Sequence, residues 1–215
     1  MKTQLTLVSK NAAVQVLRFR ITLLGIKPPI WRIIEVLADC TFWDLHCAIQ
    51  DAVGWQNMHL FEFEIGGTGR RRLGSTRIGV PIDDAFMSEM TELLPAWKAQ
   101  VVARLGDVNA KARYVYDFGD GWEHDVTLEA IAPVQPGARY PRCDAGERRG
   151  PPEDVGGPPG YEQFLEAMAD AGHAAHAEYR AWIGRRWDPD AFDPRKVKFG
   201  DSKARLRRLM KELGG

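Results

Sequence analysis

The clearest pattern in the sequence is an alternation of apolar and polar positions near the N-terminus. Every second residue from Leu17 to Leu23 is apolar, with arginine or threonine between them. This period of two predicts a half-buried strand. Gly25 and the Pro28–Pro29 pair interrupt the pattern, and Ile30 to Val36 then carries apolar residues on both faces. We interpret this second strand as a central strand of a sheet.

A helical pattern follows the two strands. Thr41 stands three residues before Asp44, the spacing of a capping box at a helix N-terminus. Apolar residues then recur at helical spacing as far as Val53, and Gly54 is placed to end the helix. His46 and Gln50 are four residues apart on this helix, and we expect them to lie away from its apolar stripe.

Three further strands are predicted from the same period-two pattern. Residues 59–65 alternate up to Gly66. Arg113–Phe118 and Trp122–Ile131 alternate on both sides of Gly119-Asp120-Gly121, which predicts a hairpin with a tight turn.

The remaining segments complete the expected α+β class. Residues 70–81 are interpreted as an exposed loop or irregular hairpin, 88–94 as a short helix, and the Pro- and Gly-rich stretch 138–160 as irregular. Helices are expected over 161–169, 173–183 and 202–213. We therefore predict a mostly antiparallel sheet packed with helices and a mainly helical C-terminal third, in a single domain over residues 14–215 after a poorly patterned tail, residues 1–13.

Composition restricts the class of protein. The 29 Lys and Arg residues balance 29 Asp and Glu residues, which excludes a generally basic nucleic-acid-binding surface. The three cysteines are too few for a disulfide framework and fit a reducing compartment. No apolar run approaches the roughly 18 residues of a membrane span. We expect a cytoplasmic protein with no membrane partner.

Polar residues gather around the predicted hairpin and the Pro-Pro-Glu-Asp-Val-Gly-Gly segment at 151–157. His124 of the predicted hairpin begins a row of apolar residues on its strand, and His59 begins another such row ahead of residues 61–65. Together with nearby carboxylates they are candidates for an acid–base or metal site. The alternative is that the carboxylates only accept hydrogen bonds from turn amides. The candidate pocket comprises His59, Asp117, Asp120, His124, Glu153 and Asp154.

Motifs for other chemistries are missing from the sequence. Without CxxC or HExxH spacing we assign no metal ligands, and without GxGxxG, Walker A or GxSxG motifs we expect no cofactor and no α/β-hydrolase chemistry. Lys203, Arg207 and Arg208 lie in a basic C-terminal tract. They are interpreted either as a solvated helix face or as phosphate contacts that give weak, non-specific nucleic-acid binding.

Several blocks of the chain resemble one family. The similarity extends over about residues 14–199, and it is carried by Ile26–Arg32, Asp44–His46, Gly54-Trp55, His59-Leu60, Tyr114–His124, Tyr140–Cys143, Pro151–Gly157 and Gly160-Tyr161. These blocks resemble the plasmid pRiA-type "Orf three-like" family, which is associated with insertion-element passengers and a TnpR-like, or resolvase-like, label. The resemblance implies an α+β domain carried by many bacteria and no defined activity.

The resolvase label finds no support in the residues. The serines are Ser9, Ser75, Ser88 and Ser202, and none has the arginine-rich setting of a recombinase nucleophile. Our leading hypothesis is a cytoplasmic binding or accessory module associated with plasmids and mobile elements, with no partner identified. The alternatives are a small hydrolase-like or metal-binding enzyme that uses the candidate pocket, and a weak nucleic-acid binder that uses the C-terminal helix.

Overall fold

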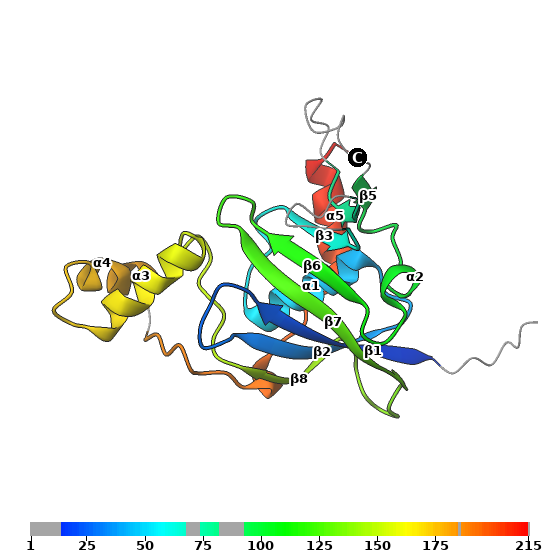
Figure 1. Ribbon diagram of the computed structural model, residues 1–215, viewed down its shortest axis with the longest axis horizontal. Coiled ribbons are helices and arrows are strands. Elements are labelled where there is room, and N and C mark those ends of the chain that lie inside the picture. Colours follow the sequence, from blue (N-terminus) through cyan, green and yellow to red (C-terminus); the bar gives the residue numbers. More distant parts are fainter. Residues whose placement is uncertain (1–13, 68–73, 82–92, 185, 215) are drawn as a thin grey trace, which may run out of the picture.

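The computed structural model describes residues 14–67, 74–81, 93–184 and 186–214, which form one mixed sheet with helices on one face and at one end (Figure 1). The strands are β1 (Gln15–Leu23), β2 (Trp31–Leu37), β3 (Phe61–Ile65), β4 (Thr76–Gly79), β5 (Leu93–Pro95), β6 (Lys111–Tyr116), β7 (Trp122–Pro133) and β8 (Arg142–Glu147). The helices are α1 (Phe42–Val53), α2 (Val102–Leu105), α3 (Gly157–Ala169), α4 (His176–Ile183) and α5 (Ser202–Glu212), with a 3₁₀ turn, η1 (Pro194–Lys196).

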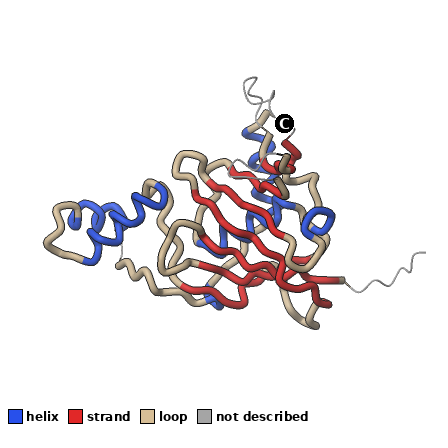
Figure 2. Tube along the Cα trace, viewed as in Figure 1, coloured by secondary structure: helices blue, strands red, loops and turns tan. Residues whose placement is uncertain are grey.

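The sheet confirms the predicted α+β class. Its strand order is β5-β4-β3-β6-β7-β1-β2-β8, and every neighbouring pair is antiparallel except β4 and β5 (Figure 2). β2 lies inside the sheet, between β1 and β8, as its two apolar faces predict. The β6–β7 hairpin is also formed as predicted, with Tyr116 opposite Trp122 at its end.

Helix α1 covers one face of the sheet and encloses the core. Its first turn is a complete capping box, in which the Thr41 side chain accepts from the Asp44 amide and the Asp44 side chain accepts from the Thr41 amide. Gly54 ends the helix in the left-handed region, at φ +100°. The alternate residues Phe19 of β1 and Phe63 of β3 are fully buried on this face. The apolar half of the period-two pattern therefore forms the core.

The polar half of the pattern lies on the other face and pairs across strands. Arg20 of β1 bonds Glu129 of β7 at 3.0 Å, and Arg142 of β8 bonds Glu35 of β2 at 2.8 Å. The Arg113 side chain pairs with Glu123 across the β6–β7 hairpin. Opposite charges in directly paired strands add to sheet stability.

The structure differs from the sequence prediction in several segments. Helix α3 begins at Gly157, inside the stretch 138–160 that was predicted as irregular, and α2 was not predicted. Residues 142–147, predicted as irregular, form β8 because their backbone pairs with β2, although their side chains carry no period-two pattern. Residues 76–79 form β4, and Leu93-Leu94 belong to a strand, β5, where a helix was predicted. The rest of that helix, residues 88–92, and the predicted tail, residues 1–13, lie outside the described residues.

Helices α3 and α4 form a helical arm that extends to the left of the sheet in Figure 1. Phe164 of α3 is buried at its centre, with edge contacts to Tyr179 and Trp182 of α4 and to Trp187 at 5.3, 5.9 and 5.3 Å between ring centroids. The chain then returns to the sheet through η1, which contacts β8.

Candidate functional site

The first part of the site is the turn of the β6–β7 hairpin. Asp117 follows β6 in the left-handed region, at φ +54°, which is uncommon for a residue other than glycine. One carboxylate oxygen, Oδ1, accepts from the amides of Gly119 and Asp120 at 3.0 and 3.3 Å. The other oxygen, Oδ2, lies 3.5 Å from His59 Nε2. The turn therefore holds Asp117 with one oxygen free to face the histidine.

The second part is the segment between β8 and α3. Asp154 also lies in the left-handed region, at φ +57°, and its Oδ1 atom is 2.8 Å from His59 Nε2. The Gly156 amide donates to Asp120 Oδ2 at 3.1 Å. The two segments that the sequence marked as polar therefore meet, and backbone contacts hold them together.

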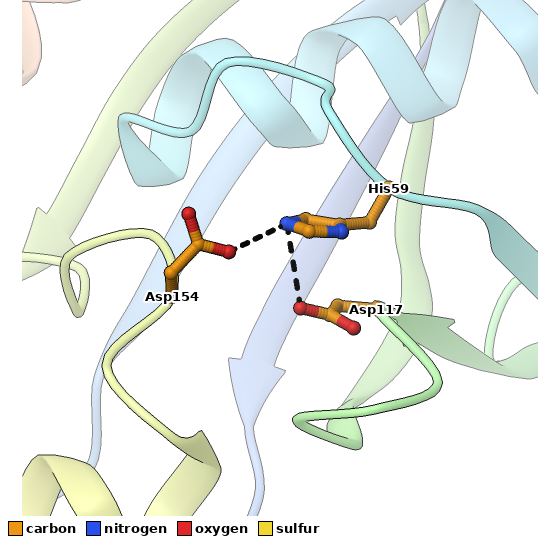
Figure 3. A group of neighbouring side chains, drawn as sticks. All are labelled: His59, Asp117 and Asp154. Atoms are coloured by element: carbon orange, nitrogen blue, oxygen red, sulfur yellow. Dashed lines mark hydrogen bonds and ion pairs between the residues drawn. The ribbon is translucent and has the colours of Figure 1, made fainter.

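His59 completes the group from the turn between α1 and β3. The His59, Asp117 and Asp154 side chains converge on one point, with the three ligand atoms within 4.8 Å of one another (Figure 3). Their side chains are 31%, 13% and 59% exposed, so the group is open to solvent on the Asp154 side. We call these three residues the His59 triad.

Glu153 lies beside the triad but faces another set of groups. Its Oε1 atom accepts from the Gln56 amide at 2.6 Å and from the Tyr116 hydroxyl at 3.1 Å. That hydroxyl accepts in turn from the Met58 amide at 3.0 Å. Burial is the main cause of a raised pKa for the Glu153 carboxyl. Asp120, through its bond to Gly156, likewise supports the site without facing His59.

His124 lies apart from the carboxylates of the candidate pocket. Its ring is buried among core aromatics, 5.4 Å from the Trp55 ring and 5.3 Å from the Tyr114 ring. Neither ring nitrogen makes a hydrogen bond of good geometry with the described residues. Burial lowers the pKa of His124 to about 4, so the ring is neutral at physiological pH. The structure brings two of the four candidate carboxylates, Asp117 and Asp154, to His59, and His124 lies among aromatic rings instead.

A second histidine network contradicts the expectation that His46 and Gln50 lie away from the apolar stripe. Both side chains are fully buried under β6. His46 Nδ1 accepts from the Tyr114 hydroxyl at 2.8 Å, Gln50 donates to the same hydroxyl at 3.0 Å, and His46 Nε2 contacts the Asn57 side chain. Burial lowers the pKa of His46 to about 3. The partners come from distant segments, so the local helical pattern carries no signal of this network.

The basic candidates lie on α5. Lys203 and Arg208 are exposed, and Arg207 is 3.8 Å from Asp201. Arg208 also lines a cleft of about 420 Å³ that includes His59 and Arg205 in its wall. Of the three basic candidates, only Arg208 therefore shares a cleft with His59, and Lys203 and Arg207 do not line it.

The sheet order defines an α+β fold. Its conspicuous polar feature is the His59 triad, which forms where the β6–β7 hairpin meets the segment between β8 and α3. The family described as plasmid pRiA4b ORF-3-like protein matches residues 15–196, and the chain belongs to this family. This result confirms the resemblance found in the sequence blocks.

Two relatives extend the comparison. The "Uncharacterized protein y4hQ" of Sinorhizobium fredii is 35% identical over 170 residues, which cover 79% of this chain and 81% of that protein. A crystal structure of the protein of unknown function MM3350 from Methanosarcina mazei Go1 is 37% identical, with a TM-score of 0.76, and covers 87% of this chain and all of that one. Within the part of the chain that the structure describes, no helix has both the length and the hydropathy that a membrane crossing needs.

Proposed function

We propose that this protein is a metal-binding module in which His59 Nε2, Asp117 Oδ2 and Asp154 Oδ1 bind one divalent cation. The observation that carries the proposal is the convergence of these three atoms from three segments far apart in the sequence. Ligands about 2.0–2.2 Å from one ion lie roughly 3–3.5 Å from each other. The separations of 2.8 and 3.5 Å from His59 Nε2 fit this geometry.

The backbone supports a binding role for both carboxylates. Asp117 and Asp154 each occupy the left-handed region, a conformation that is strained for residues other than glycine and that gathers at binding and active sites. His59 Nε2 carries at most one proton, which can serve only one of the two carboxylates well. A cation at the same point would satisfy the nitrogen lone pair and both oxygens together.

The donor set indicates the class of metal. One imidazole nitrogen with two carboxylate oxygens suits borderline divalent ions such as Zn²⁺ and Mn²⁺. Three protein ligands leave a coordination position for water or a ligand, as in catalytic zinc sites. Hydrolysis is therefore the second candidate function. It is favoured by the solvent-open side of the triad, where the Asp154 side chain is 59% exposed and water can reach the metal position.

The test is titration of the metal-free protein with Zn²⁺ and Mn²⁺ by calorimetry, with bound metal counted by elemental analysis. We expect one ion per chain for the native protein and at least a tenfold weaker affinity for Asp154→Asn and His59→Gln. Asp125→Asn is the matched control, because Asp125 is an exposed carboxylate of β7 outside the triad. No saturable binding to the native protein, or equal losses in the control, would overturn the proposal.

The cellular setting belongs to the same proposal. A cytoplasmic accessory role is supported by three unpaired cysteines, Cys40, Cys47 and Cys143, which suit a reducing compartment. The plasmid origin of the family description supports an association with mobile elements. Fractionation of cells that express the tagged protein tests the location, and recovery in an extracellular or membrane fraction would contradict it.

A further inference from the structure

Arg32 is the last residue of the sequence block Ile26–Arg32, which contributes nothing to the His59 triad. The side chain of Arg32 has an unusual environment. Arg32 is 1% exposed, yet every hydrogen bond given for its guanidinium goes to a backbone carbonyl. It donates to Ala52 at 2.7 Å and to Glu147 and Arg148 at 2.8 Å. Burial lowers the pKa of Arg32 to about 10, so the group is still cationic at neutral pH. The fold therefore buries a positive charge that has no carboxylate counter-ion among the described residues.

Arg32 lies in the wall of a wide cleft, which we call the Arg32 cleft. The cleft has a volume of about 840 Å³. Its walls are the C-terminal end of α1, residues 149–153, the end of α4 and residues 187–198. This volume is within the range of roughly 300–1,000 Å³ that is typical of small-molecule sites.

The charges that line the Arg32 cleft do not balance. Four cations line it: Arg32, Arg149, Lys196 and Lys198. None of the four forms an ion pair among the described residues. The carboxylates of the lining are already engaged: Asp51 with Arg205 at 2.5 Å, Asp193 with Arg195 at 2.9 Å, and Glu153 with the Tyr116 hydroxyl. The cleft therefore has a positive potential that an anion would neutralise.

Aromatic rings form part of the wall. Phe192 stacks on the Arg32 guanidinium at 3.6 Å, and Trp187 lies under Arg149 at 4.9 Å. Trp182, at the end of α4, is 46% exposed although its ring belongs to the aromatic cluster of the helical arm. An exposed indole beside free cations offers a stacking surface to a planar ring.

We propose that the Arg32 cleft binds a nucleotide, with its phosphates at Lys196, Lys198 and Arg149 and its base against Trp182. This site lies outside the triad and does not depend on the metal proposed there. Phosphate carries the negative charge that the free cations require, and the planar base matches the exposed indole. A mononucleotide fits a cleft of this size better than a polymer, which needs an extended track of cations.

The experiment is calorimetric titration of the full chain with ADP in the presence of EDTA, which removes any metal contribution. We expect saturable binding of ADP, at least tenfold tighter than binding of adenosine or of inorganic phosphate. Lys196→Gln with Lys198→Gln is expected to weaken ADP binding at least tenfold, and Trp182→Leu severalfold. The matched control is Lys98→Gln with Arg104→Gln, two exposed cations outside the cleft, which should leave the affinity unchanged.

Each other result bears on the proposal directly. No binding at millimolar ADP, or equal losses in the control variant, would overturn it. Phosphate binding as tight as ADP binding would indicate an anion site without a base subsite, and tighter binding of a single-stranded oligonucleotide would indicate a nucleic-acid site, so both would also overturn it. Unchanged ADP binding by Asp154→Asn, whatever that variant does to metal binding, would separate this cleft from the triad.

Discussion

The carbonyl oxygen of Asp120 lies against Gly157, so closely that a Cβ atom added to the glycine would come within 2.2 Å of it. Asp120 is at the tip of the β6–β7 hairpin, and Gly157 begins α3 at φ +67°. With the bond from the Gly156 amide to Asp120, this contact fixes the position of the neighbouring Asp154 relative to Asp117. The triad therefore depends on a contact that only glycine permits.

We expect Gly157→Ala to lower the free energy of unfolding and to weaken metal binding. The left-handed backbone alone costs about 1–2 kcal/mol for alanine, and the contact with a backbone oxygen adds to this cost. Gly137→Ala is the control, because Gly137 has φ +78° but no atom within 4 Å of an added Cβ. Urea denaturation should give a loss at least about 2 kcal/mol larger for Gly157→Ala. Equal losses would mean that the contact relaxes freely.

The parts of the fold that sequence analysis predicted are those with a local signal. The Thr41 capping box and the β6–β7 hairpin depend on residues close together in the chain, and both are formed. β8 was missed because its strand character comes from pairing with β2, and its Cys143–Gly146 side chains do not alternate.

The candidate site also has parts with a local sequence signal and parts that depend on tertiary packing. Sequence analysis selected the polar hairpin and the polar loop, but which histidine the carboxylates face depends on tertiary packing. His59 and Asp154 are 95 residues apart, and no periodicity relates them. His124 follows the strand pattern into the core, where its neighbours are aromatic rings. The burial of His46 also depends on a tyrosine hydroxyl supplied by a distant strand.

We expect the free energy of unfolding to fall as the pH is lowered from 7 to 5. Burial lowers the pKa of His46 to about 3 and of His124 to about 4, whereas in the unfolded chain a histidine pKa is about 6.5. The unfolded state therefore binds more protons below pH 6.5, and stability that is present at pH 7 is lost on acidification. Each histidine contributes about 2 kcal/mol over this range.

The measurement is urea denaturation at pH 7, 6 and 5 for the native protein and for His124→Leu. Because neither His124 nitrogen makes a good hydrogen bond, the leucine variant should fold and should show a smaller pH effect, by about 2 kcal/mol. His173→Asn changes an exposed histidine and should retain the full effect. An unchanged pH dependence in His124→Leu would mean that His124 is protonated in the folded state.

Arg32→Lys is expected to destabilise the protein by about 3 kcal/mol. The guanidinium bonds carbonyls of three segments: Trp31 of β2, Ala52 near the end of α1, and Glu147 and Arg148 at the end of β8. A lysine ammonium cannot reach all of them from one position, and each unsatisfied buried carbonyl is costly. Thermal unfolding measures the effect, and Arg104→Lys on exposed α2 should change stability by less than about 0.5 kcal/mol. A small effect of Arg32→Lys would show that water replaces the lost bonds.

The last prediction concerns nucleic acid and the C-terminal basic tract. Seven cations lie between Lys196 and Lys211, but Arg205 bonds Asp51 at 2.5 Å and Arg207 is 3.8 Å from Asp201. The five that remain can each release about one counterion, so the slope of log affinity against log salt should be no steeper than about −4.5.

Helix α5 is docked on α1 and cannot lie freely in a DNA groove. The Trp43 indole donates to the Ser202 carbonyl at 2.8 Å, and the Ser202 hydroxyl bonds Asp44 at 2.6 Å. The chain also has no net charge to attract DNA over a distance. We therefore expect micromolar or weaker binding that disappears near physiological salt, and a further loss when Lys203, Arg207 and Arg208 are all changed to Gln. A titration at two salt concentrations checks this expectation, and nanomolar, sequence-selective binding that the triple variant abolishes would assign α5 a specific role in DNA recognition.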